Sequence, residues 1–152
     1  MTRRFMSKNP SSARNLVFVD TSAWIMLLNQ DENRHKEAVE TYNGYLKNKV
    51  KLTSNMVIAE TYTWLRLRIG FESAMDFLKI MRQMQEEEFL VIVWSDNDIE
   101  NKSFRYLQKY DDHGLSFADA VSFAIMDEMG IKDAFTFDRH FVITGFLPVN
   151  SL

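Results

Sequence analysis

Residues 16–20 have the sequence LVFVD, which is the strongest indication of the fold class of this chain. Four consecutive apolar residues, two of them valines, show no alternation with polar ones, which is typical of a short parallel strand buried on both faces of a sheet. Asp20 ends this run, and residues 21–29 after it have the pattern of a short helix. We therefore expect a buried first strand that delivers a carboxylate to one edge of a parallel sheet.

Strand and helix patterns alternate along the rest of the chain. Short β-rich runs predict further strands at residues 51–53, 89–94 and 134–137. Helix starts are marked by Ser54 or Asn55, by a capping box of Ser95 with Asp98, and by Ser116. The predicted helices cover residues 21–29, 32–48, 55–67, 72–85, 96–110 and 117–129, and the stretch from residue 139 onward has no clear pattern. The expected fold is α/β, a three-layer α/β/α sandwich on a mostly parallel central sheet.

Composition limits the possible classes of protein. With 152 residues, 46% of them hydrophobic, the chain fits one compact domain, which we place at residues 15–152 after a basic, flexible N-terminal extension at residues 1–14. The absence of cysteine excludes disulfides and thiolate metal sites and suits a reducing, cytoplasmic setting. No apolar run approaches the roughly 20 residues that cross a bilayer, so we expect no membrane association. A net charge of −3 argues against a protein that coats nucleic acid, yet it does not exclude a nuclease.

Four acidic residues stand out against this background. Asp20, Glu60 and Asp119 are each the only charged residue in a long, mostly apolar stretch, and Asp138 follows the last predicted strand. An ionised carboxylate near a core costs several kcal/mol unless a positive charge lies beside it. Because the carboxyl ends of parallel strands meet at one edge of a sheet, the four carboxylates can converge there, and their mutual repulsion then requires a cation. The pattern predicts a divalent metal site built from oxygen ligands.

Four small polar residues lie close to these acids in the sequence and could support a metal site. Thr21, Asn55, Ser116 and Thr136 carry small oxygen-bearing groups that can hold metal-bound water or orient a carboxylate.

Three of the acids also have a purely structural interpretation. Asp20 can cap the helix that follows it, Asp119 can complete a capping box with Ser116, and Asp138 can cap a turn. Glu60 is the hardest to explain in this way, because it lies in the middle of a predicted helix. A single cap is an easy explanation, but four independent caps at the mouth of one sheet are less probable than one shared site.

Four short motifs in order resemble the PIN domain family, and within it the VapC-type ribonuclease toxins of bacterial and archaeal toxin–antitoxin pairs. The motifs are VDTS at residues 19–22, Asn55 with Glu60 on a helix, LSFADA at residues 115–120, and TFDRHF at residues 136–141 with a Gly-Phe pair at 145–146. Each motif alone is weak, whereas all four in this order and spacing are specific. The N-terminal extension is longer than in many such toxins, and Asp111 and Asp112 are extra acids to which the pattern gives no role.

The resemblance implies an endoribonuclease that hydrolyses RNA phosphodiester bonds with Mg²⁺ or Mn²⁺. Asp20 and Asp119 would be the principal metal ligands, and Glu60 and Asp138 would complete the catalytic site directly or through water. A small antitoxin protein and a second copy of the chain are the implied partners. His140 is expected to pack or cap in the last segment and not to act in catalysis. RNA phosphates could be contacted by Arg66, Arg68, Lys102, Arg105 and Arg139.

Other protein classes also place acidic residues at the ends of parallel strands. A receiver-like domain needs an acidic pair after the first strand and a lysine after the last, and neither is present. A haloacid-dehalogenase-type phosphatase needs a second acid where Ser22 stands. Two alternatives stay open: a PIN-domain nuclease of housekeeping RNA processing, and a non-catalytic PIN fold that binds RNA or protein. The second usually lacks one or more of the four acids, and all four are present here.

Overall fold

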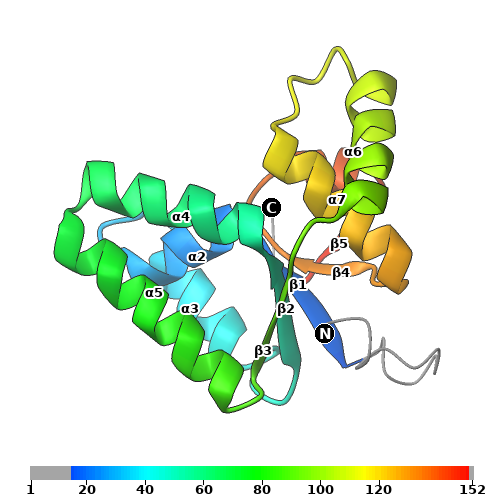
Figure 1. The fold of residues 1–152 in the computed structure, drawn as a ribbon. Helices are drawn as coiled ribbons and strands as arrows, with labels where there is room; N and C mark the ends of the chain where they lie inside the picture. Colours follow the sequence, from blue (N-terminus) through cyan, green and yellow to red (C-terminus); the bar gives the residue numbers. More distant parts are fainter. Residues whose placement is uncertain (1–14, 151–152) are drawn as a thin grey trace.

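The centre of the molecule is a five-stranded parallel sheet. The computed structural model describes residues 15–150, so the basic extension expected at residues 1–14 lies outside the described residues. The strand order is β3-β2-β1-β4-β5, and every neighbouring pair is parallel (Figure 1). The strands are β1 (Leu16–Val19), β2 (Val50–Ser54), β3 (Leu90–Val93), β4 (Asp133–Phe135) and β5 (Leu147–Pro148). The expected α/β architecture with a parallel central sheet is confirmed.

Helices cover both faces of this sheet. In Figure 1 the helices α2 to α5 lie on one side, and α6 with α7 lie on the other. The connections explain this division, because right-handed crossovers that advance from β1 through β2 to β3 leave their helices on one face, and the return to β4 leaves its helices on the opposite face. The helices are α2 (Thr21–Leu28), α3 (His35–Asn43), α4 (Asn55–Arg68), α5 (Phe71–Glu86), α6 (Asn97–Lys109), α7 (Phe117–Met129) and α8 (His140–Ile143).

β1 in the central sheet and α7 in the layer beside it contribute a large part of the hydrophobic core. Val17, Phe18 and Val19 are fully inaccessible to solvent, as their unbroken apolar run predicts. Every residue from 118 to 126 on α7 is buried too, because this helix lies between the sheet and α6. The ring of Phe123 stacks on Phe146 at 5.5 Å. These rigid, apolar elements fix the polar ends that emerge from them.

The direction in which the chain leaves the sheet changes between β1 and β4. From β1 the chain moves to β2 and β3 on one side, whereas β4 and β5 lie on the other side. A parallel sheet has a crevice at the carboxyl ends of the two strands that flank such a switch point, and ligand sites form there. Asp20 follows β1 directly, and Asp138 comes shortly after β4. The topology therefore brings two of the four predicted acids to one crevice.

Several element boundaries differ from the sequence prediction. β4 ends at Phe135, two residues early, and the stretch after residue 138 contains the short helix α8 and the edge strand β5. The predicted capping box of Ser95 with Asp98 is wrong, because the side chain of Asp96 caps α6 by accepting the backbone N–H of Ile99 at 3.0 Å. The long helix predicted over residues 32–48 is only α3, followed by turns. In the described part of the chain, no helix combines the length and apolar composition needed to cross a membrane.

Candidate metal centre

Asp20 is held rigidly at the end of β1. Its backbone N–H donates to the carbonyl of Phe135 at 3.0 Å, which ties it to β4, and its side chain is 3% exposed. One carboxylate oxygen, Oδ2, accepts hydrogen bonds from the hydroxyls of Ser22 at 2.8 Å and Thr136 at 3.0 Å. The same oxygen caps α2 through the backbone N–H of Ser22 at 3.4 Å. Capping and a site role are therefore compatible, because they use one oxygen and leave the other.

The two hydroxyls also connect Asp20 to the segment that carries Asp138. Ser22 Oγ accepts the backbone N–H of Phe137 at 2.8 Å, and Thr136 Oγ1 accepts the backbone N–H of Asp138 at 3.0 Å. The loop after β4 is thus fastened to the acid at the end of β1. Thr136 was among the predicted supporting residues, but Ser22 was not. Thr21 was chosen in its place, and its buried hydroxyl has no hydrogen-bond partner within residues 15–150.

Asp119 approaches from the start of α7. It forms the predicted capping box, in which Asp119 N–H donates to Ser116 Oγ at 3.0 Å and Ser116 N–H donates to Asp119 Oδ2 at 3.1 Å. The side chain is 12% exposed, in the first turn of a helix whose N-terminus favours negative charge. Within the described residues no donor is hydrogen-bonded to Oδ1 of Asp119 or of Asp20. Each acid therefore keeps an uncommitted oxygen.

Asp138 and His140 complete the cluster from the loop before α8. Asp138 Oδ1 caps this turn by accepting His140 N–H at 2.9 Å, as the structural interpretation predicted. The Nδ1 atom of His140 lies 3.0 Å from Asp138 Oδ1 and 3.8 Å from Asp119 Oδ2. Ligand atoms of Asp119, Asp138 and His140 all lie within 4.8 Å of one another, whereas Asp20 is outside this close group and is connected to it through Thr136. Sequence reasoning left His140 outside the site, although the short spacing from Asp138 was the available signal.

The hydrogen bonds of His140 decide which of its ring nitrogens faces the acids. Its Nε2 atom lies 2.9 Å from the carbonyl oxygen of His113, and because a carbonyl can only accept, Nε2 carries the hydrogen. In a neutral imidazole Nδ1 then has a lone pair, which here faces the carboxylate of Asp138. Nδ1 is therefore the ring nitrogen that could serve as a metal ligand beside Asp119 and Asp138.

The pKa values of two of the acids, Asp20 and Asp119, are raised by their surroundings. Burial, followed by the nearby charge of Asp119 and then of Asp138, raises the pKa of Asp20 to about 7, against the hydrogen bonds from Ser22 and Thr136, which lower it. Burial also raises the pKa of Asp119, with the charges of Asp138 and Glu60 adding to the effect. Carboxylates that destabilise one another in this way are a frequent mark of functional sites and of metal sites in particular.

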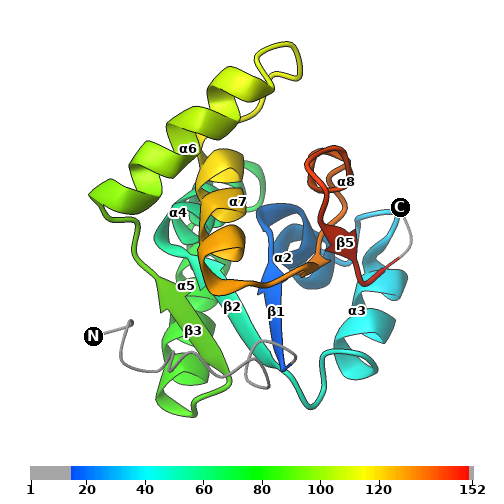
Figure 2. The ribbon, with the colours of Figure 1, turned by 90° about the vertical axis from the view of Figure 1, so that its right-hand side faces the viewer.

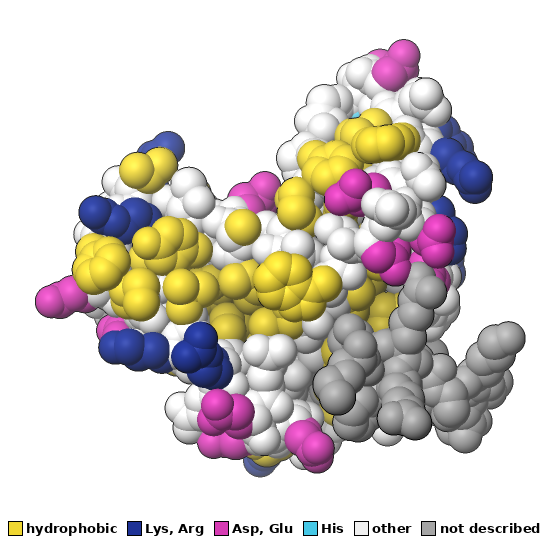
Figure 3. Space-filling view, viewed as in Figure 1, with side chains coloured by type: hydrophobic (Ala, Val, Ile, Leu, Met, Phe, Trp, Pro, Cys, Tyr) yellow, Lys and Arg dark blue, Asp and Glu magenta, His cyan; other side chains and the backbone are white. Residues whose placement is uncertain are grey.

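Glu60 lies on the far wall of a groove beside the cluster. It is exposed on α4, whose buried residues are Val57, Thr61 and Leu65, so its carboxylate does not lie in the core as that of Asp20 does. The apolar residues around Glu60 line a surface groove of about 610 Å³ between α4 and the start of α7, which we call the α4 groove. Figure 3 shows the molecule hollowed between these two sides. Glu60 still lies close enough to Asp119 to raise the pKa of that acid.

The other predicted residues lie further from the acids or at the rim. The side-chain oxygen of Asn55 accepts Ser95 N–H at 3.0 Å and so joins the start of α4 to the end of β3. Arg66 lies over the ring of Phe71 at 5.4 Å, at the far end of α4. Arg68 lines the α4 groove, and the exposed Arg139 lies between Asp138 and His140. Of the three arginines, only Arg139 is next to the acid cluster in sequence.

The donor set fits a hard divalent cation. Carboxylate oxygens from β1, α7 and the loop after β4, with one imidazole nitrogen, are ligands that Mg²⁺ and Mn²⁺ accept. Asp20, Asp119 and Asp138 would hold such an ion, with His140 beside them and Glu60 able to reach it through water. The hydroxyls of Ser22 and Thr136 donate to Oδ2 of Asp20 and would orient this carboxylate toward the metal ion, as supporting groups do in metal sites.

Replacing Ser22 tests that supporting role. Ser22→Ala removes one donor to Asp20 and leaves the Phe137 N–H without its acceptor, so we expect a loss of about 1–2 kcal/mol in the free energy of unfolding and about tenfold weaker Mg²⁺ binding. Denaturant unfolding and a Mg²⁺ titration measure the two effects. Ser103→Ala is the matched control, because that buried hydroxyl donates to Ile99 on α6, outside the acid cluster. Equal Mg²⁺ affinity in both variants would contradict the role of Ser22.

Comparisons with known proteins show to which family this fold belongs. The family model of the PIN domain matches residues 17–147. The 23S rRNA-specific endonuclease VapC20 of Mycobacterium tuberculosis is 35% identical over 135 residues, which cover 88% of this chain and 98% of the relative. The crystal structure of VapC20, described as a Sarcin-Ricin loop cleaving toxin, superposes with a TM-score of 0.78 at 34% identity, over 86% of this chain and 96% of that one.

A more distant structure shares the fold alone. FitAcB from Neisseria gonorrhoeae superposes with a TM-score of 0.63 at 14% identity, over 87% of this chain and 95% of that chain. The parallel sheet, the acids at its switch point, the family match and the VapC20 relative agree with one another. This chain belongs to the PIN domain family.

Proposed function

We propose that this protein is a Mg²⁺- or Mn²⁺-dependent endoribonuclease that cuts RNA of the large ribosomal subunit, and that it is the toxin of a toxin–antitoxin pair. The observation that carries the proposal is the placement of Asp20, Asp119 and Asp138 at the switch point of the sheet, where burial first, and then the charges of Asp119 and Asp138, raise the pKa of Asp20 to about 7. A non-catalytic PIN fold has no need to retain so costly a cluster.

The chemistry assigned to the site is hydrolysis of a phosphodiester bond. A bound divalent ion supplies an activated water and neutralises charge on the phosphate. The chain's own residues position the parts: Ser22 and Thr136 hold Asp20, the capping box holds Asp119, and the first turn after Asp138 holds His140. The oxygen of water joins phosphorus and the bond to the 3′-oxygen breaks, which leaves a 3′-hydroxyl and a 5′-phosphate. No histidine or lysine is required as general base.

The ribosomal substrate is proposed from the relative. VapC20 is a 23S rRNA-specific endonuclease, and the similarity extends over almost the whole of that protein. Incubation of the purified protein with ribosomes and Mg²⁺, followed by primer extension on the large-subunit RNA, should show one discrete cut in the sarcin–ricin loop. EDTA should abolish it, and Mn²⁺ should restore it. Cleavage that is indifferent to EDTA would overturn the metal-dependent mechanism.

The proposed protein partner is a small antitoxin that covers the α4 groove. Met56, Trp64, Leu67 and Phe117 give this groove an apolar lining, and Glu60 adds one negative charge close to the acids. An amphipathic helix with a basic side chain fits such a lining and would bring its positive charge toward the cluster. A homodimer is a further part of the proposal. An enzyme that acts on ribosomes works in the cytoplasm, so we propose that location too.

A housekeeping nuclease would use the same acids, so the cellular role needs its own test. If the protein is a toxin, its induced expression should arrest growth, a short gene that encodes a small protein should adjoin its own gene, and co-expression of that gene should relieve the arrest. Normal growth during expression of an enzyme that is active in vitro would favour housekeeping RNA processing.

A further inference from the structure

One side of α6 carries a row of positive charges. Lys102, Arg105 and Lys109 are spaced three and four residues apart, which places them on one face of the helix. Together with Tyr106 and Tyr110 they line a groove of about 410 Å³ between α6 and α7 that ends at Thr144 beside α8. Two acids of α7 line it as well: Glu128 is paired with Lys102, and Asp127 accepts the hydroxyl hydrogen of Tyr106. We call this surface the α6 groove; in Figure 2 the three helices that border it face the viewer. It is separate from the apolar α4 groove.

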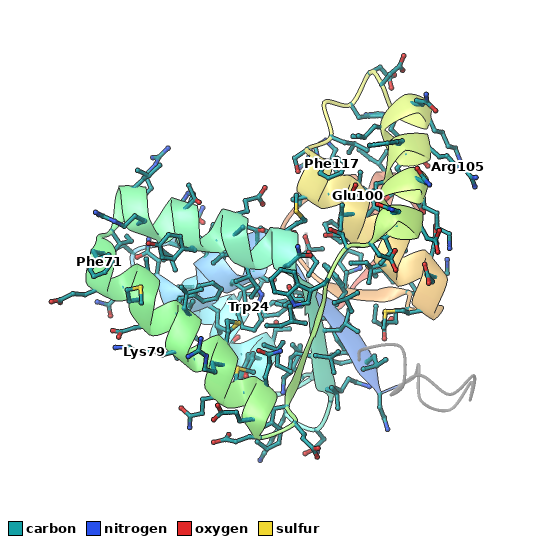
Figure 4. The ribbon with its side chains drawn as sticks, in the orientation of Figure 1. Trp24, Phe71, Lys79, Glu100, Arg105 and Phe117 are labelled. Carbon is teal, nitrogen blue, oxygen red and sulfur yellow. The ribbon has the colours of Figure 1, made fainter. Side chains whose placement is uncertain are left out.

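Two of the three cations are available to a ligand. Lys102 is paired with Glu128 at 3.2 Å, but within residues 15–150 neither Arg105 nor Lys109 has a carboxylate within ion-pair distance. Both side chains are exposed. In Figure 4 the labelled Arg105 projects outward from α6, away from the side on which Glu100 and Phe117 lie. Lys109 Nζ also lies over the ring of Tyr110, 5.4 Å from its centroid, so a cation and an aromatic ring stand together on this side of α6.

Aromatic rings extend from this groove toward the acids. The rings of Tyr106 and Tyr110 are stacked with centroids 6.2 Å apart and planes 13° apart, and the ring of His113 lies 5.9 Å from that of Tyr110. The carbonyl of His113 accepts the Nε2 hydrogen of His140 at 2.9 Å, and Nδ1 of His140 lies 3.0 Å from Asp138. An unbroken series of contacts therefore joins the α6 groove to the metal centre.

We propose that the α6 groove binds the RNA strand that flanks the cleaved bond, with Arg105 and Lys109 on phosphates and the ring of Tyr110 stacked on a base. The proposal rests on the function proposed above and specifies where its substrate lies. A polyanion that approaches three carboxylates needs compensating positive charge outside the metal centre, and this row is joined to that centre by contacts. Cations interleaved with stacked aromatic rings are the usual platform for a single nucleic-acid strand.

The test compares the double variant Arg105→Ala/Lys109→Ala with Lys79→Ala. Lys79 is an exposed lysine of α5 and lies on the opposite side of the molecule in Figure 4. The probe is a synthetic RNA hairpin that carries the sarcin–ricin loop sequence. We expect KM for the double variant to rise about tenfold with little change in kcat, and the slope of log affinity against log salt to fall by about 1 for each cation removed. Lys79→Ala should behave as the wild type.

The tyrosine has a separate test with its own control. Tyr110→Ala should weaken hairpin binding about tenfold, whereas Tyr110→Phe, which keeps the ring, should bind as the wild type. A melting curve of each variant checks that the fold is kept.

Failure of this proposal can be told apart from failure of the proposed function. If the wild type cuts the hairpin and the double variant has an unchanged KM and salt slope, the α6 groove does not bind the substrate. If the wild type cuts no RNA, the proposed function is wrong, and binding of the hairpin to the uncleaving protein, measured by fluorescence anisotropy, still decides whether Arg105 and Lys109 contact RNA. Equal binding by the double variant overturns the proposal in that case too.

Discussion

Asp119→Asn is expected to abolish RNA cleavage while the protein keeps or gains thermal stability. Asparagine preserves the shape of the side chain and an oxygen that can accept Ser116 N–H, so the capping box of α7 can persist. It removes one of the charges that raise the pKa of Asp20. It also removes a negatively charged oxygen from the cluster with Asp138 and His140, so the loss of activity should reach about a hundredfold or more.

The measurement is a cleavage time course on large-subunit ribosomal RNA beside a melting curve. Asp76→Asn is the control, because this exposed acid of α5 takes no part in the acid cluster, and it should cleave at the wild-type rate. If Asp119 is only a capping residue, the variant will cleave RNA normally. If it is only a structural acid that the fold needs, the melting temperature will fall together with the activity.

Without divalent metal, the stability of the wild type should decrease as pH rises from about 4 to about 7. The pKa of Asp20 is about 7 in the folded protein, against 3.8 for an ordinary aspartate. Between these values the folded chain holds a proton that the unfolded chain has released, so raising the pH favours unfolding. Three pKa units correspond to a penalty on the order of 4 kcal/mol above pH 7, which binding of a divalent cation should offset.

Asp20→Asn isolates this effect. The asparagine has no charge to bury, so the variant should be more stable than the wild type at pH 8, and the two should converge near pH 4. Denaturant unfolding in EDTA at several pH values measures the difference. A wild type that is at least as stable as Asp20→Asn at pH 8 in EDTA would show that Asp20 carries no such penalty.

Local signals explain why much of the fold could be predicted. The apolar run before Asp20 can only be a buried strand, and the capping box of Ser116 and Asp119 marks the start of α7 within one residue. The position of the acids followed from topology, because strands that alternate with helices bring their carboxyl ends to one edge. These features depend on residues close in sequence or on a general rule of parallel sheets.

The parts that were missed depend on contacts between distant segments. β5 has only two residues and is a strand because it pairs with β4, so no β-rich run in the sequence could predict it. His140 enters the site through the carbonyl of His113, and Ser22 through the backbone of Phe137. For Glu60, the apolar stretch around it does not decide between a core helix and an exposed apolar face, and in the structure these neighbours line a groove. Sequence periodicity does not distinguish a buried helix face from an exposed apolar one.

A Mg²⁺ titration of the melting temperature tests most directly whether Asp20, Asp119 and Asp138 form a site for a divalent cation. At pH 8 the melting temperature of the wild type should rise with Mg²⁺ concentration and continue to rise above the dissociation constant, as for any ligand of the folded state alone. Asp119→Asn, measured in parallel, should show little or no rise. A wild-type melting temperature that does not respond to Mg²⁺ or Mn²⁺, or an equal rise in Asp119→Asn, would contradict the proposed metal site.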